Sequence, residues 1–159
     1  MINNFRGEND FLSNFHILQN PIHFGNLIFK TSEHFFAAHK SLIYEERVWI
    51  ASLPEAREAK WAGSPKGYKG RKIHLREDWD DDDVKWSVMY LALMMKYTSN
   101  YNLAAKLMNT APQQLVEGNR WHDNYWGDCF CDGCSHKEGK NILGLMHMHI
   151  RDKFFQIRI

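Results

Sequence analysis

An acid and an amine stand seven residues apart in the segment 31–40, TSEHFFAAHK. If this segment is a helix, Thr31 or Ser32 caps its start. Glu33 and Lys40 then share one face, about 10 Å apart along the axis. That separation is too long for a direct ion pair, so the face offers an acid, a gap and an amine. The alternative is a surface Glu and Lys on an ordinary amphipathic helix.

A second carboxylate of interest, Asp123, lies in the polar, aromatic and glycine-punctuated stretch 117–141. Trp121 and Trp126 flank it, and indole rings can desolvate a carboxyl group or stack on a substrate ring. The stretch is too long for an idle connector, and long loops in compact domains are commonly functional. We therefore expect Asp123 to take part in chemistry.

Three cysteines in the same stretch belong to a residue type that binds zinc. Cys129, Cys131 and Cys134 are accompanied by His122 and His136. The C-x-C-x-x-C spacing lacks a second C-x-x-C pair, however. An odd number of cysteines without an export signal does not indicate a disulfide framework either. We therefore favour reduced thiols packed in the loop over a structural zinc, and we expect no catalytic metal and no cofactor.

A basic, glycine-rich stretch, GSPKGYKGRK, spans residues 63–72. It lacks the spacing and the closing Lys-Ser/Thr of a Walker loop. Such a loop can still hold a phosphate through backbone amides and an arginine, here Arg71 with Lys69 or Lys72 behind it. The alternative is a solvated turn.

The elements that position these side chains are expected to be mostly helical. The acidic run 78–83 suits the start of a long helix that ends near Lys96, and the helix dipole explains that run without a cation. The remaining expected helices cover 45–52, 55–62, 103–108 and 141–155. Short strands are expected at 27–30 and 114–117, with further short strands and turns among the first thirty residues.

The composition fits one soluble domain over residues 1–159, of α+β class and mostly helical with a few short strands. Twenty basic side chains nearly balance nineteen acidic ones, so no global positive field indicates nucleic acid. No apolar run is long enough to span a membrane, and the first residues lack the apolar core of a signal peptide. We therefore expect a cytoplasmic protein with no membrane partner.

The order of these motifs resembles the NADAR, or YbiA-like, family, and the resemblance covers nearly the whole chain. The matching pieces are FLSNF at 11–15, TSEHFFAAHK at 31–40, GR at 70–71, R-x-D-W at 76–79, Met89, Lys96, Tyr97, Thr110, L-x-E at 115–117, D-x-x-WG at 123–127 and N-x-LG-x-x-x-M-x-IR at 141–151. The chain departs from the family at Ala111, where a glycine is frequent, and at His147, where a leucine is usual.

The resemblance implies an enzyme that hydrolyses an N-glycosidic bond. In the family, some members cleave phosphoribosylaminopyrimidine intermediates of riboflavin synthesis, which we expect here. Others remove ADP-ribose from modified guanine bases, which makes an ADP-ribosyl substrate on nucleic acid the alternative. Two non-enzymatic readings remain, a binding module for ADP-ribose or a nucleotide and a zinc-stabilised interaction protein.

Cleavage of a C–N glycosidic bond develops positive charge at the anomeric carbon and requires a proton on the leaving nitrogen. We expect Glu33 and Asp123 to share these two roles. Lys40 either forms a Schiff base with the opened sugar or holds a phosphate, and Arg71 is the expected phosphate contact. The remaining candidates are Trp79 and Trp126, which would stack on the base or shape the pocket, and Ser13 and Asn14, which would bind sugar hydroxyls or merely satisfy a turn.

Overall fold

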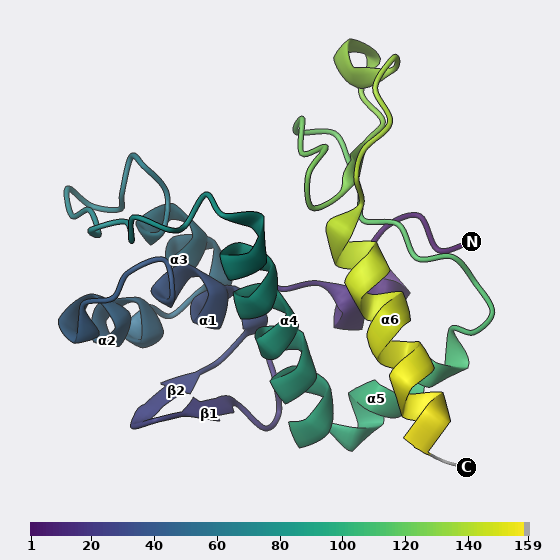
Figure 1. The fold of residues 1–159 in the computed structure, drawn as a ribbon, viewed down its shortest axis with the longest axis horizontal. Coiled ribbons are helices and arrows are strands. Elements are labelled where there is room, and N and C mark those ends of the chain that lie inside the picture. The colour runs from purple at the N-terminus through teal and green to yellow at the C-terminus, as the bar shows by residue number, and fades with distance from the viewer. Residues whose placement is uncertain (158–159) are drawn as a thin grey trace. The chain divides into compact units, whose positions relative to one another are not determined.

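Helices make up most of the regular structure in the computed structural model, which describes residues 1–157 (Figure 1). The α-helices are α1 (Ser32–Ala38), α2 (Tyr44–Ser52), α3 (Ala56–Ala62), α4 (Asp82–Ser99), α5 (Tyr101–Asn109) and α6 (Ile142–Ile157). The 3-10 helices are η1 (Gly7–Leu12) and η2 (Asp132–Cys134), and the strands are β1 (Ile22–Phe24), β2 (Leu27–Phe29), β3 (Gly118–Asn119) and β4 (Asp128–Cys129). The expected α+β, mostly helical class is confirmed.

The chain divides into two compact units. The central unit is Asn14–Asn100, and the terminal unit joins Met1–Ser13 to the described residues from Tyr101 onward. The expectation of a single domain over the whole chain stays a prediction. No helix in the part of the chain that the structure describes is long and apolar enough to cross a membrane.

The central unit is organised around α1. This helix packs against α2, α3 and α4, and Figure 1 shows it between α4 and the α2–α3 pair. Strands β1 and β2 form an antiparallel hairpin in which Ile22 pairs with Phe29. Every residue of α1 is buried, the polar Ser32, Glu33 and His34 included. The alternative of a surface Glu and Lys on an amphipathic helix is therefore wrong for Glu33, because neighbours cover α1 on all sides.

Helix α4 begins with the acidic run, although at Asp82 rather than at residue 78. The Asp81 side chain accepts a hydrogen bond from the backbone N–H of Asp83 over 2.9 Å and caps the helix. Asp82 and Asp83 then lie in the first turn, where the helix dipole favours negative charge.

In the terminal unit α5 packs against α6, and β3 pairs with β4 in parallel. Buried Arg151 on α6 donates to the Thr110 hydroxyl over 3.0 Å and to the Gln113 carbonyl over 2.8 Å. His147, which stands where the family usually has a leucine, is buried and bonds through Nε2 to the Leu12 carbonyl over 2.9 Å. A histidine thus fits this core position because a carbonyl accepts its ring N–H.

One sequence prediction about a strand is wrong. Residues 114–117 form no strand, and only a single bridge joins Leu115 to Ile2. The Asn141 side chain instead accepts from the N–H of Glu117 over 3.0 Å and donates to the Leu115 carbonyl over 2.9 Å, so it replaces a partner strand. Near the N-terminus, Phe11 and Leu12 are the last two residues of η1, and 13–15 form a bend and a turn.

Candidate active site

A chain of hydrogen bonds fixes the start of α1. The Thr31 hydroxyl accepts from the backbone N–H of His34 over 3.2 Å and lies 2.8 Å from His34 Nδ1, while His34 Nε2 lies 2.9 Å from the Leu53 carbonyl oxygen. Because a carbonyl can only accept, Nε2 carries the proton and Nδ1 accepts from Thr31. Burial lowers the pKa of His34, and this keeps its imidazole ring neutral.

Glu33 follows this cap and is buried. Its backbone N–H donates to the Asn14 carbonyl over 3.0 Å, which holds Asn14 against the start of α1. Burial raises the pKa of the Glu33 carboxyl group, and the positive charges of Lys40 and Lys60 partly oppose that rise. The net effect favours a carboxyl group that keeps its proton to higher pH than usual, which suits a general acid.

Lys40 lies just beyond the C-cap of α1, and protein groups rather than water surround most of its side chain. Its Nζ donates to the Gly63 carbonyl over 3.2 Å and lies 5.3 Å from the ring centre of Phe36 and 5.8 Å from that of Trp79. Burial lowers the pKa of Lys40, and the Glu33 charge opposes that change. A lowered amine pKa increases the neutral fraction, which is the nucleophilic form.

Gly63 allows α3 to end directly against α1. A Cβ atom at Gly63 would lie 3.1 Å from the Ala37 Cβ and 3.4 Å from the Lys40 Cδ. Trp79 is also part of this packing, because it is 7% exposed and its ring centre lies 5.1 Å from that of Phe36. The site therefore holds Lys40 by packing from several elements rather than by one partner.

Two polar side-chain atoms belong to residues next to Glu33, one adjacent in the sequence and one joined to it by a backbone hydrogen bond. Neither atom has a hydrogen-bond partner among the described residues. They are the Asn14 Oδ1 and the Ser32 Oγ, both buried. The Asn14 Nδ2 contacts the Met89 sulfur over 3.4 Å. A buried polar group without a partner costs about 1–3 kcal/mol, so such groups commonly mark a missing ligand or water.

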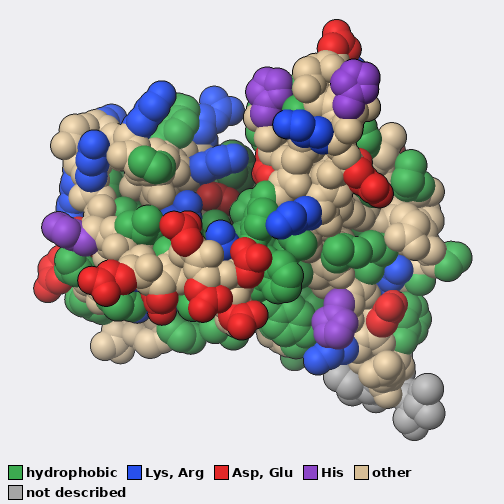
Figure 2. Space-filling view, turned by 45° about the horizontal axis from the view of Figure 1, so that its top comes forward, with side chains coloured by type: hydrophobic (Ala, Val, Ile, Leu, Met, Phe, Trp, Pro, Cys, Tyr) green, Lys and Arg blue, Asp and Glu red, His purple; other side chains and the backbone are tan. Residues whose placement is uncertain are grey.

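The basic loop forms a tight turn. Tyr68 and Arg71 exchange two backbone hydrogen bonds of 2.9 and 3.0 Å across Lys69 and Gly70, which both have positive φ. Arg71 is exposed, and its guanidinium group lies 4.3 Å from the ring centre of Trp49. Figure 2 shows the Lys and Arg side chains of the central unit gathered on one part of the visible face and its acidic side chains on another.

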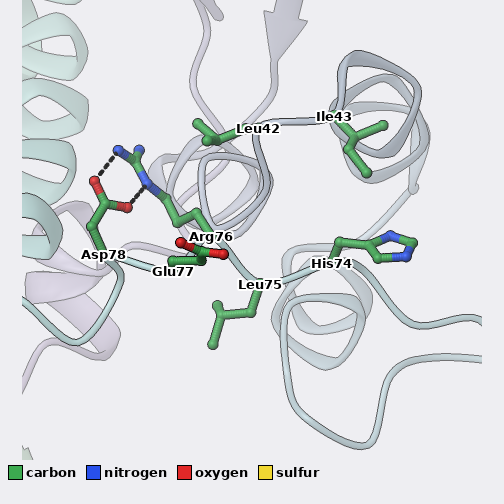
Figure 3. A pocket seen from close by; sticks show the side chains of 7 residues that line it. All are labelled: Leu42, Ile43, His74, Leu75, Arg76, Glu77 and Asp78. Carbon is green, nitrogen blue, oxygen red and sulfur yellow. Dashed lines mark hydrogen bonds and ion pairs between the residues drawn. The ribbon is translucent and has the colours of Figure 1, made fainter.

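Two of the hollows in the central unit differ in how they relate to the predicted site residues. The larger, of about 500 Å³, contains no predicted site residue, and its lining includes an ion pair between Arg76 and Asp78 (Figure 3). The smaller, of about 300 Å³, is lined by the α1 cap Thr31, by Phe15 next to Asn14, and by Lys30 and Arg57. The smaller hollow is thus the one bordered by the segments that hold Glu33 and Asn14.

Asp123 and Trp126 belong to the terminal unit. One carboxylate oxygen of Asp123 accepts from the backbone N–H groups of Tyr125 and Trp126, over 3.0 and 2.9 Å. Asp123 is half-buried, and the Trp126 ring meets that of Tyr125 edge to face at 5.2 Å. Ser13 is in the same unit, half-buried at the end of η1, where its N–H donates to the Asp10 carbonyl over 2.8 Å.

The cysteine-bearing excursion 129–138 begins and ends at one narrow place, which we call the loop base, Gly127–Asp128 and 139–141. There the Gly139 N–H donates to the Asp128 carboxylate over 2.9 Å, and the Asn141 N–H donates to the Gly127 carbonyl over 3.1 Å. A Cβ at Gly139 would lie 2.5 Å from the Asp128 Cα and from the Gly127 oxygen. Only glycine fits where the two strands of chain cross so closely.

A family model described as the NADAR domain matches residues 3–155. The chain belongs to the NADAR family. The resemblance predicted from the sequence motifs is therefore confirmed.

Relatives in this family are named as glycosidases. The chain is 35% identical over 133 residues to the N-glycosidase YbiA of Escherichia coli strain K12, which covers 84% of this chain and 75% of the relative. An N-glycosidase of Nostoc punctiforme is 29% identical over 132 residues, which cover 83% and 78% of the two chains. The NMR structure of the Escherichia coli YbiA protein matches with a TM-score of 0.77 and 31% identity, over 99% of this chain and 89% of that one.

A plant relative is named for riboflavin biosynthesis rather than as a glycosidase. The chloroplastic riboflavin biosynthesis protein PYRR of Zea mays is 33% identical over 152 residues, which cover 89% of this chain and 23% of the plant protein. This NADAR chain thus corresponds to about a quarter of that longer protein.

Of the predicted site residues, the central unit holds Asn14, Glu33, Lys40, Arg71 and Trp79, and the terminal unit holds Ser13, Asp123 and Trp126. Within the central unit, Glu33 interacts with Lys40 through charge, and Lys40 contacts Trp79. Arg71 contacts Trp49. Their catalytic and binding roles stay predictions.

Sequence reasoning missed two contributors to the Glu33 surroundings, His34 and Lys60, and it considered Ser32 only as an alternative cap. His34 follows the expected cap by three residues, a spacing at which a side chain can bond back to a cap, so a signal was present. Lys60 gave no such signal, because its approach to Glu33 depends on the packing of α3 against α1.

Proposed function

We propose that this NADAR-family N-glycosidase hydrolyses the C–N bond of a phosphoribosylated aminopyrimidine, an intermediate of riboflavin biosynthesis. The reaction class follows from the family and from the two relatives named N-glycosidase over most of their lengths. The similarity to the maize riboflavin biosynthesis protein supports the choice of substrate. The observation that carries the proposal is the burial of Glu33, which raises the pKa of its carboxyl group although the charge of Lys40 opposes that rise.

The reaction breaks the bond between the anomeric carbon and the amine nitrogen. In our proposal Glu33 donates its proton to the leaving nitrogen, so the bonding electron pair leaves with the amine. A water molecule then adds to the oxocarbenium-like carbon and loses a proton to the Glu33 carboxylate, which restores the acid. Burial of Glu33 supports this role because it raises the pKa of the carboxyl group.

Lys40 has two possible roles in the same reaction. A neutral Lys40 amine can attack C1 of the ring-opened sugar, which is still joined to the substrate amine as an imine. The C–N bond to that amine breaks as the amine takes up a proton and leaves, C1 becomes a Schiff base with Lys40, and water hydrolyses the Schiff base to release the sugar. A charged Lys40 can instead hold a phosphate or stabilise negative charge. Burial lowers the pKa of the amine, and this favours the nucleophilic role.

The polar atoms around Glu33 support a ribose-binding role. Asn14 Oδ1 and Ser32 Oγ are buried without a partner among the described residues, and sugar hydroxyls are suitable donors and acceptors for them. Arg71 is exposed on a tight basic turn, which suits contact with a phosphate group. Asp123, in the terminal unit, is our proposed second carboxylate.

A parallel hydrolysis assay tests the proposal. The purified protein is offered the phosphoribosylaminopyrimidine and, separately, a guanine oligonucleotide that carries ADP-ribose, and products are identified by mass spectrometry. We expect ribose 5-phosphate from the first substrate, loss of that product in Glu33→Gln, and normal release in the control Glu45→Gln, which changes an exposed acid at the start of α2. Release of ADP-ribose alone would replace the proposed substrate. No release from either would overturn the proposed activity.

A further inference from the structure

Four side chains of zinc-binding type meet in the terminal unit. They are His122 and the three cysteines Cys129, Cys131 and Cys134, and one ligand atom from each lies within 4.8 Å of all the others. Ligand atoms bound to one tetrahedral zinc at about 2.0–2.3 Å lie about 3.5–3.8 Å apart. We propose that these four side chains bind one Zn²⁺ ion in a closed structural site.

The contacts of the histidine favour a metal over ordinary hydrogen bonds. His122 Nδ1 lies 3.3 Å from the Cys131 sulfur and 3.3 Å from the Cys134 sulfur. One ring nitrogen has either one lone pair or one proton, so it cannot form a good hydrogen bond with both thiols at once. A cation that shares the histidine lone pair and the sulfur lone pairs accounts for both short distances.

The burial of the sulfur atoms also supports a bound cation. Cys129 is 3% exposed and Cys134 is 7% exposed, and Cys131 is half-buried between them in the chain. Hydrophobic packing alone does not explain why three thiol groups are gathered in one small volume. Zinc would bind them as thiolates and release their protons to solvent.

The surrounding backbone holds the ligands in place without the metal. Asn119 is buried, and its Oδ1 accepts from the N–H groups of Trp121 and Asp123, both over 3.2 Å, while its Nδ2 donates to the Asp123 carbonyl over 2.7 Å. These bonds fix the backbone on both sides of His122, whose φ is +67°. An unusual φ in a residue other than glycine persists where its surroundings determine it.

The cysteine side of the site is fixed in a similar way. The Cys129 N–H donates to the Asn124 side-chain oxygen over 2.9 Å, and the Cys134 N–H donates to the Cys131 carbonyl over 3.0 Å in the turn η2. Four protein ligands complete a tetrahedral shell and leave no position for a reacting water, so the proposed zinc is structural rather than catalytic. Because His122 precedes Asp123, the metal would also hold the turn that carries this carboxylate.

Metal analysis of the tag-free protein, purified with a reductant, tests the proposal directly. We expect one zinc per chain in the wild type, and near-complete loss in Cys131→Ser and in His122→Ala. The matched control is His136→Ala, since His136 is an exposed histidine of the same loop outside the cluster, and it should keep its zinc. Zinc that survives Cys131→Ser, or that is lost in His136→Ala, would contradict the assignment.

Cobalt substitution gives a result that does not depend on whether the variants fold. Co²⁺ added to metal-depleted, reduced wild type should bind in equal amount and give the visible bands of a tetrahedral site and the near-ultraviolet absorption of thiolate ligands. A folded wild-type protein that takes up neither Zn²⁺ nor Co²⁺ would overturn the proposal. So would a disulfide among the three cysteines that persists under reductant.

Discussion

The Lys40 ammonium group donates to the carbonyl oxygen of Gly63 over 3.2 Å, so a charged side chain is held by a helix end rather than by a carboxylate. The aromatic rings of Phe36 and Trp79 lie near the same ammonium group. A carbonyl and two rings stabilise an ammonium ion less than water does, which is why burial lowers the pKa of Lys40. This relationship makes Lys40 the most informative residue to replace.

Replacement of Lys40 by arginine and by methionine separates its two proposed roles. If Lys40 forms a Schiff base, both variants lose turnover, because neither side chain is a nucleophilic amine. Borohydride added during turnover should then attach the sugar covalently to Lys40 in the wild type, as mass spectrometry of peptides would detect. Turnover retained in the arginine variant, with no trapped adduct, would leave only the electrostatic role.

Replacement of Glu33 by glutamine should reduce kcat by about 10²–10⁴-fold, the usual contribution of a general acid or base. Burial raises the pKa of Glu33, so the proton-donating form persists to higher pH than for an ordinary glutamate. The rate of the wild type should therefore fall as pH rises through that raised pKa. The residual rate of the Glu33→Gln variant should not fall over this pH range. If it still falls, another group causes the pH dependence.

Asp123 needs two substitutions, because its carboxylate both carries charge and accepts two backbone hydrogen bonds. Asparagine can accept the same two bonds from Tyr125 and Trp126 without the charge, whereas alanine removes both. If the charge is needed for catalysis, Asp123→Asn loses turnover and keeps the thermal midpoint of the wild type. A fully active asparagine variant beside a destabilised alanine variant would show that Asp123 is structural.

Buried His39 should make the protein less stable in acid. Burial lowers the pKa of His39 to about 4 from an ordinary value of 6.5, so the unfolded chain takes up this proton at higher pH than the folded chain does. The stabilising contribution is full above about 6.5, is lost as pH falls toward about 4, and amounts to about 3 kcal/mol. Urea unfolding at several pH values measures it.

The matched variants for that measurement are His39→Phe and His23→Gln. Phenylalanine cannot titrate and still fits a position stacked on Phe35 at a ring distance of 4.0 Å, so the loss of stability in this pH range should shrink. His23 is exposed, and its replacement should leave the slope unchanged. An unchanged slope in His39→Phe would show that other groups cause the acid sensitivity.

Gly63→Ala should destabilise the protein by about 1–3 kcal/mol, the usual cost of an extra methyl group in a tightly packed place. The new Cβ would lie 3.1 Å from that of Ala37 and would move the end of α3 away from α1. Turnover should fall as well, because the Gly63 carbonyl positions Lys40. Arg57→Ala, on an exposed part of α3, is the stability control. Equal thermal midpoints for both variants would contradict the close packing.

Local signals in the sequence were enough to predict α1 and its cap. Thr31 is a good N-cap, and the structure uses it as one. The burial of α1 could not be predicted, since a helix covered on all sides has no apolar stripe to recognise. Polar Ser32, Glu33 and His34 look exposed in the sequence, and only the packing of three other helices buries them.

The zinc cluster was harder to predict for a related reason. The expected pattern of two C-x-x-C pairs is absent, and the fourth ligand, His122, stands seven residues before Cys129. Helical or strand periodicity cannot bring these two residues together. The parallel pairing of Asn119 with Cys129 does so, and a two-residue strand leaves little trace in a sequence.

The narrow loop base has a consequence for how the chain can change over time. Residues 129–138 leave and return at points that are already joined by hydrogen bonds, so the excursion can lengthen, shorten or be exchanged without moving α6. Three of the four proposed zinc ligands lie inside it. A single deletion of this segment would therefore remove the three cysteines together, and a single insertion would add them together. After such a deletion His122 would remain as an ordinary surface histidine.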